Sequence, residues 1–183
     1  MYWILECYGP SDQERASIDR VPFLPGVQWI LGARFQVPIP TPLEITIESG
    51  LMMPMFSRGI LLWREDVVAT LADAGVDNFD SYDSILIDLL TGRRFHNYKA
   101  INILGLVAAA DLAKSKYAAP SGSALIDTDF DSLVIDQTKA RGLSLFRLAE
   151  CVTAIVVHQR VRQRLEEKGI QYLNFVAPDK WIG

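Results

Sequence analysis

Few residues of this chain have the types and spacing that chemistry requires. Asp127, Asp129 and Asp131 place three carboxylates at alternate positions, and hard divalent cations bind several oxygen ligands of this kind. A calcium loop also needs glycine at its sixth position and glutamate at its twelfth, where this chain has Ser132 and Thr138. The sequence therefore predicts no metal site here. The carboxylates are expected to form an exposed acidic patch, which either is merely solvated or meets a basic partner.

Histidine and cysteine offer no better candidate. The histidines are His96 and His158 and the cysteines are Cys7 and Cys151, so a zinc site would need four distant residues to converge. Cys151 lies in an apolar run with no neighbour that would activate its thiol, which argues against a nucleophile pair with His158. The chain also lacks the glycine-rich phosphate loops, HExxH and GxSxG. It is therefore expected to be no enzyme and to use no cofactor.

The composition is that of a globular protein. Of the 183 residues, 50% are hydrophobic and 22% are charged, and 18 basic against 22 acidic side chains give a net charge of −4. This balance argues against nucleic-acid binding, which needs a basic face. No apolar run approaches the roughly 20 residues of a membrane span, and the first residues lack the pattern of a signal peptide. Two isolated cysteines fit a reducing compartment, so we expect a cytoplasmic protein without membrane contact.

Hydrophobic periodicity predicts both strands and helices. Strands are expected at residues 2–8, 43–48, 84–90, 93–98, 100–107, 130–135, 143–148, 152–158 and 170–176. Apolar stripes predict helices at residues 64–74 and 158–168, each followed by a glycine that can end it. The run at residues 100–107 is expected to be a central strand buried on both faces, and residues 11–20 and 113–122 are expected to be loops.

These elements predict an α+β or mixed α/β fold. It would hold one mainly antiparallel or mixed sheet, two main helices and a proline-rich N-terminal third. Six of the nine prolines lie between residues 21 and 54, which favours irregular segments and edge strands there. Residues 1–60 are therefore expected to form an N-terminal strand and a proline-rich region, either a lobe or an edge of the same domain. Residues 61–183 are expected to form the α/β domain proper.

The order of short motifs between residues 75 and 175 resembles a bacterial family of immunity domains. The motifs are AGVDNF at 74–79, YKAINILG at 98–105, LFRL at 145–148 and IVVH at 155–158. This family was first catalogued as a domain of unknown function. It is named after a myxobacterial immunity protein and is encoded beside polymorphic or secretion-system toxins. The resemblance covers a little over half of the chain and implies a protein that binds and neutralises a cognate toxin.

The positions that match the family are expected mainly to hold the fold: they are Tyr98, Asn102, Gly105, Phe146 and Arg147. Asn102 is expected to satisfy backbone groups beside the central strand, and Gly105 to permit a close backbone approach. Arg147 lies in an otherwise apolar strand. If buried, it needs a partner, for which Asp136 or Asp111 are the candidates.

Three functions remain open on the sequence alone. The first is an immunity protein that neutralises a toxin, which needs contact area and hot spots but no catalytic residue. The second is a self-associating structural domain that forms a homodimer through its apolar N-terminal third. The third is a small metal-dependent enzyme that uses Asp127, Asp129 and Asp131. A toxin gene beside this one would favour the first, a concentration-dependent mass the second, and a bound metal the third.

Overall fold

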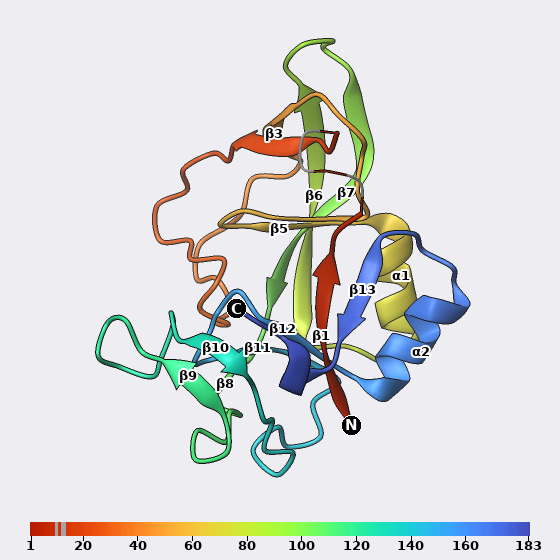
Figure 1. Cartoon of the computed structure of the whole chain (residues 1–183). Coiled ribbons are helices and arrows are strands. Elements are labelled where there is room, and N and C mark those ends of the chain that lie inside the picture. Colours follow the sequence, from red (N-terminus) through yellow and green to blue (C-terminus); the bar gives the residue numbers. More distant parts are fainter. Residues whose placement is uncertain (10, 12–13) are drawn as a thin grey trace.

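Strands dominate the computed structural model, which describes residues 1–9, 11 and 14–183. Within this part of the chain, strands account for 39% and helices for 12%, and three sheets accompany two short helices. The predicted α+β or mixed α/β fold, with one sheet and two main helices, is therefore wrong (Figure 1). The physical reason is that several short strands carry no periodic signal of their own and form only by pairing with distant segments.

The larger sheet is six-stranded in the described part of the chain and nearly closes into a barrel. In spatial order its strands are β2 (Ser17–Arg20), β3 (Leu43–Glu48), β6 (Phe79–Asp88), β7 (Arg94–Ile103), β5 (Leu61–Arg64) and β4 (Met55–Ser57). Only the β3–β6 pair is parallel among these pairings. Since β2 and β4 are the two edge strands, the barrel-like sheet remains open between them.

A second sheet, five-stranded within the described residues, joins the two ends of the chain. Its spatial order is β13 (Leu173–Val176), β1 (Tyr2–Cys7), β12 (Ile155–His158), β11 (Leu145–Leu148) and β8 (Leu106–Val107). β11 and β8 are parallel, and the other pairs are antiparallel. β9 (Lys116–Ala118) and β10 (Asp129–Ser132) form a third, two-stranded sheet. The 3-10 helix η1 (Pro178–Lys180) follows β13.

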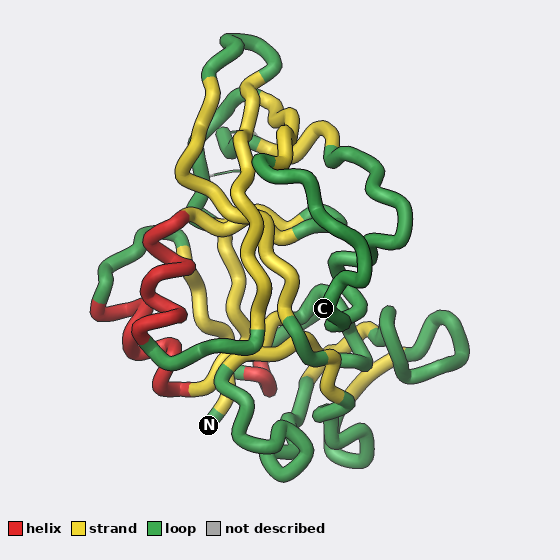
Figure 2. The backbone as a smooth tube through the Cα atoms, turned by 180° about the vertical axis from the view of Figure 1, so that it is seen from behind, coloured by secondary structure: helices red, strands yellow, loops and turns green. Residues whose placement is uncertain are grey.

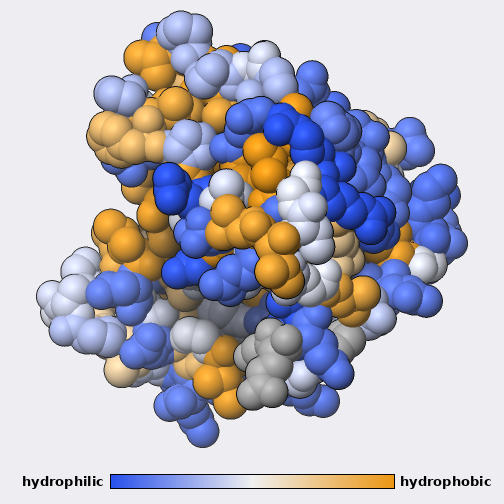
Figure 3. Space-filling view, turned by 90° about the horizontal axis from the view of Figure 1, so that it is seen from above, coloured by the Kyte–Doolittle hydropathy of each residue, from blue (hydrophilic) through white to orange (hydrophobic). Residues whose placement is uncertain are grey.

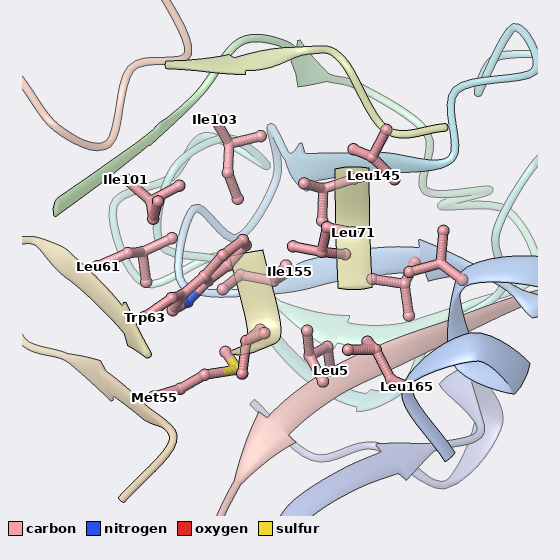
Figure 4. Close-up of a cluster of buried hydrophobic side chains, with 14 of the residues drawn as sticks. Leu5, Met55, Leu61, Trp63, Leu71, Ile101, Ile103, Leu145, Ile155 and Leu165 are labelled. Atoms are coloured by element: carbon pink, nitrogen blue, oxygen red, sulfur yellow. The ribbon is translucent and has the colours of Figure 1, made fainter. Parts of the chain in front are cut away.

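The helices α1 (Glu65–Asp73) and α2 (Gln159–Glu167) each begin directly after a strand. They contact each other and lie side by side at one edge of the molecule, opposite the longest loops (Figure 2). Their buried apolar residues complete a core between the two sheets, shown in Figure 4. This core holds Leu71 of α1 and Leu165 of α2 against Trp63 of β5 and Ile101 of β7. The two predicted helices are thus confirmed, and the apolar stripe predicted for each lies on its buried side.

The proline-rich segment packs onto the barrel-like sheet. Trp29 is buried and makes edge-on ring contacts with Phe35 and Tyr82, with centroid distances of 4.9 and 5.8 Å. Strands from residues 1–60 lie in both sheets, because β1 pairs in the five-stranded sheet while β2, β3 and β4 pair in the six-stranded one. The five-stranded and the six-stranded sheet therefore each contain strands from residues 1–60 and strands from residues 61–183.

The apolar run at residues 100–107 is not one strand. β7 ends at Ile103, and Gly105 then adopts a φ of +129° that turns the chain. Leu106 and Val107 continue as β8 in the other sheet. Hydrophobicity alone cannot show such a transfer, since the residues on both sides of the turn are apolar, those of β7 buried and those of β8 half-buried. Within the predicted loop at 11–20, residues 17–20 form β2, so that prediction is wrong in its second half.

Candidate functional site

The hairpin of β6 and β7 extends beyond the rest of the sheet, and its tip is the uppermost part of the molecule in Figure 1. Its tip presents two adjacent hydrophobic side chains to solvent, Leu89 at 56% exposure and Leu90 at 83%. From above, this end of the molecule shows hydrophobic residues among hydrophilic ones (Figure 3). These two side chains contribute little to the core, and their position together on a protruding tip makes the tip a candidate contact surface.

Asp88 fixes the shape of the tip. One oxygen of its carboxylate accepts hydrogen bonds from the backbone N–H groups of Leu90 and Thr91, both at 2.9 Å, and from the hydroxyl of Ser49 at 2.5 Å. These hydrogen bonds, that of Ser49 first, hold the pKa of Asp88 below its usual range. The carboxylate therefore stays ionised at neutral pH. The backbone that carries the two leucines is consequently held in one conformation.

Two arginines and a cavity lie beside the tip. The guanidinium of Arg93 lies 4.7 Å from the ring centre of Phe95, and Arg94 forms an ion pair with Glu44. A cavity of about 520 Å³ lies beside the tip, and its lining includes Arg93, Phe95 and Leu51. The tip thus combines apolar anchors, a cation held on an aromatic ring and a recess into which a partner side chain would fit.

The family-motif residues of β7 connect it to distant segments. Tyr98 is 1% exposed and donates a hydrogen bond from its hydroxyl to the carbonyl of Met53 at 2.7 Å. Asn102 is fully buried, and its amide nitrogen donates to the carbonyl of Ala33 at 2.9 Å. Both side chains therefore tie the proline-rich third to the barrel-like sheet. Neither contributes to an exposed site.

Gly105 lies where the two sheets meet. Its N–H donates to the carbonyl of Gly32 at 3.0 Å, and its own carbonyl accepts from the N–H of Arg147 at 3.2 Å. A Cβ on Gly105 would have room, whereas one on Gly32 would lie 2.7 Å from a backbone nitrogen. Gly105 is thus needed for its positive φ, and Gly32 provides the space for the close approach. Phe146, beside Arg147, is buried with its ring on Tyr2 at a centroid distance of 5.6 Å.

Arg147 is buried in the interior without a carboxylate. Only 2% of it is exposed, and one terminal nitrogen donates to the carbonyl of Val152 at 2.6 Å. The predicted partners do not reach it, since Asp111 binds Lys114 and Asp136 accepts hydrogen bonds within its own loop. The Nε of Arg147 has no hydrogen-bond partner among the described residues. Burial lowers the pKa of Arg147 to about 10, because the charged form is poorly solvated there.

Burial of Tyr98 leads to a prediction about alkaline stability. Burial raises the pKa of its phenol from 10.0 to about 12, so its stabilising contribution is complete below pH 10 and is lost as pH rises towards 12. Tyr98→Phe loses one hydrogen bond and should cost about 1 kcal/mol at pH 8. Between pH 10 and 12 the wild type should lose about 2–3 kcal/mol relative to this variant, because the phenolate is disfavoured inside. Urea unfolding at each pH measures the difference. A constant difference would contradict the burial of the phenol.

The acidic patch of Asp127, Asp129 and Asp131 is exposed along and before β10. Asp129 and Asp131 flank the buried Phe130, so both carboxylates face solvent. Asp127 accepts a hydrogen bond from the hydroxyl of Ser121 at 2.8 Å. Within residues 1–9, 11 and 14–183, no group of three or more His, Cys, Asp or Glu side chains is placed to hold a metal. The patch is therefore a charged surface whose geometry does not support the metal-dependent alternative.

The histidines and cysteines serve separate local roles. His158 precedes α2, and its ring nitrogen accepts a hydrogen bond from the N–H of Arg160 at 3.3 Å, which caps the helix. Cys7 and Cys151 are both free thiols. His96 lies exposed on β7. The structure brings none of these into a catalytic pair.

Sequence reasoning missed the hairpin tip. The alternation at residues 84–90 assigned Leu89 and Leu90 to the strand, although two adjacent leucines in a strand cannot both face one core. Their position directly before the turn at Thr91 and Gly92 was the available signal. Such a pair beside a turn indicates exposed apolar residues.

Comparison with protein-family models and with curated proteins found no match. The resemblance to the immunity family rests on the order of its motifs. Neither helix in the described part of the chain has the length and hydrophobicity needed to cross a bilayer.

Proposed function

We propose that this protein is an immunity protein that binds and neutralises a cognate bacterial toxin through the tip of the β6–β7 hairpin. The observation that carries the proposal is the pair of exposed leucines, Leu89 and Leu90, on a hairpin tip fixed by Asp88. Motif order supports the nature of the partner, because it resembles that of an immunity family. We place the protein in the cytoplasm of the producing cell, where the toxin would otherwise act.

The physical basis is that of a protein–protein hot spot. A few anchoring side chains supply most of the binding free energy, and they do so best when held rigidly beforehand. Leu89 and Leu90 have that arrangement, and Arg93 would meet a carboxylate at the rim of the contact. The toxin surface is therefore expected to be an apolar pocket with acidic residues around it. Binding there blocks the toxin without any catalytic step.

The acidic patch has a different part in this proposal. Asp129 and Asp131 lie on β10, away from the hairpin tip (Figure 1). Charges outside the central contact change the rate of encounter more than the lifetime of the complex. The patch would therefore speed association with a basic region of the toxin, while the leucines would set the dissociation rate.

The test is to express the product of the neighbouring gene with and without this protein. Co-expression should restore growth, and the purified pair should form a one-to-one complex with a dissociation constant of about 1 nM or below. Size-exclusion chromatography with light scattering measures both the complex and the protein alone. A partner that is not toxic, or that stays toxic when this protein is abundant, would overturn the proposal. Concentration-dependent dimerisation of the protein alone would then favour the self-associating domain.

A further inference from the structure

The turn between β11 and β12, residues 149–154, buries a carboxyl group. This group belongs to Glu150, which is only 3% exposed. Its Oε1 accepts a hydrogen bond from the backbone N–H of Ala110 at 3.2 Å, whereas its Oε2 is buried without a hydrogen-bond partner among the described residues. None of the ion pairs within the described part of the chain includes Glu150. A carboxylate in this environment is costly, because it has given up water without gaining a counter-charge.

The same turn holds residues 126–128 through backbone hydrogen bonds. The N–H of Ile126 donates to the carbonyl of Ala149 at 2.7 Å, and the N–H of Thr128 donates to the carbonyl of Glu150 at 2.9 Å. The side chain of Glu150 meanwhile binds the segment that contains its backbone donor. This residue therefore lies where the turn meets two segments that are distant in sequence, 109–111 and 126–128.

The charged groups around Glu150 do not neutralise it. Lys139 attracts the carboxylate from an exposed position in the loop after β10. Asp111 and Asp127 belong to the two packed segments, and each of their carboxylates has a partner of its own. On β11, Arg147 donates instead to a backbone carbonyl. Burial is therefore the largest effect and raises the pKa of Glu150, although backbone N–H groups and Lys139 act in the opposite direction.

We infer that Glu150 is a pH-sensitive switch that sets how firmly residues 109–111 and 126–128 are held against the β11–β12 turn. The neutral carboxyl group stays buried and keeps the two segments in contact with the turn. The ionised carboxylate gains free energy by reaching water, so ionisation favours local opening of these segments. Asp127 of the acidic patch lies in one of them, and the switch therefore acts on that surface. This inference does not depend on toxin binding.

The direction of the pH dependence follows from the burial. Because the pKa of Glu150 is raised in the folded state, the closed protein binds this proton more tightly than the opened one. The contribution of Glu150 to local stability is therefore complete at low pH and is lost as pH rises through the raised pKa. Asp88, Asp111 and Asp136 have lowered pKa values, so they titrate at lower pH than Glu150.

Hydrogen exchange of the full-length protein, measured by mass spectrometry at pH 5 and pH 8 and corrected for intrinsic exchange rates, tests the switch. At pH 8 the amides of the two segments and of the turn should have about threefold less protection than at pH 5, or lower still. Glu150→Gln keeps the Oε1 acceptor and cannot ionise. It should be equally protected at both pH values and better protected than wild type at pH 8. Glu167→Gln changes an exposed glutamate of α2 and should respond like wild type.

A measurement on the wild type alone keeps the test decisive if Glu150→Gln does not fold. In a carboxyl-detected NMR titration, one glutamate should titrate at higher pH than the others. The inference is wrong if all glutamates titrate together, if the two segments are equally protected at pH 5 and pH 8, or if Glu150→Gln retains the wild-type response. A response confined to α2 would also contradict it, because that response would come from His158, which caps this helix.

Discussion

Replacing Arg147 with methionine is expected to raise the free energy of unfolding by about 1–3 kcal/mol. The reason is that the guanidinium is 2% exposed and has no ion pair among the described residues. The shift of its pKa from 12.5 to about 10 corresponds to about 3 kcal/mol against the charged form in the folded state. Methionine has a similar length and no charge. Its cost is the unpaired carbonyl of Val152, about 1 kcal/mol.

Chemical denaturation of the two proteins at pH 7 measures this difference. Arg160→Met is the matched control, since Arg160 is exposed and its replacement should change stability by less than about 0.5 kcal/mol. Arg147→Ala should be less stable than Arg147→Met, because the shorter side chain leaves a cavity. A loss of about 3–5 kcal/mol in Arg147→Met would indicate instead that a buried ion pair had been broken.

Replacing both Leu89 and Leu90 with aspartate is expected to weaken toxin binding by at least about 30-fold, the effect of losing a hot spot worth 2 kcal/mol or more. The fold should tolerate the change, since both side chains are exposed and the backbone of the tip is held by Asp88. Stability should therefore change little, whereas co-expression should no longer rescue cells. Surface plasmon resonance with the purified toxin measures the affinity and shows whether the dissociation rate rises.

Leu125→Asp provides the control for this experiment. Leu125 is 48% exposed and lies in the chain between β9 and β10, two strands that Figure 1 shows far from the hairpin tip. The variant adds one of the two negative charges of the double variant to a comparable apolar residue, and the toxin should dissociate from it at the wild-type rate. Equal loss of binding in both variants would point to a general effect of charge. Unchanged binding by the double variant would exclude the hairpin tip as the contact.

The sequence predicted correctly those helices and strands in which apolar residues recur at a regular spacing along one buried face. Residues 43–48 alternate and form β3, and the apolar stripes at Val67 and Leu71 and at Val161 and Leu165 form the helices. β4 and β5 were missed because nearly all of their side chains are buried, which removes any alternation. Short strands of this kind are fixed by their partners, and a single sequence does not reveal pairing.

The candidate site was less accessible to sequence reasoning than the fold. Motif resemblance drew attention to Tyr98, Asn102 and Arg147, which the structure places in the interior. The hairpin tip contains no unusual residue type, since leucine is common in both strands and cores. Its significance comes from exposure, and exposure depends on where the remaining strands lie.

The position of β1 has a consequence for how the protein is made. β1 pairs on one side with β12 and on the other with β13, so both strands that pair with residues 2–7 lie among residues 155–176. While the chain is still being synthesised, this strand has no partner, and closing so long a loop is slow. The five-stranded sheet therefore forms after most of the chain has left the ribosome. Newly made molecules would pass through a period in which both edges of β1 are open, when chaperones or aggregation compete with folding.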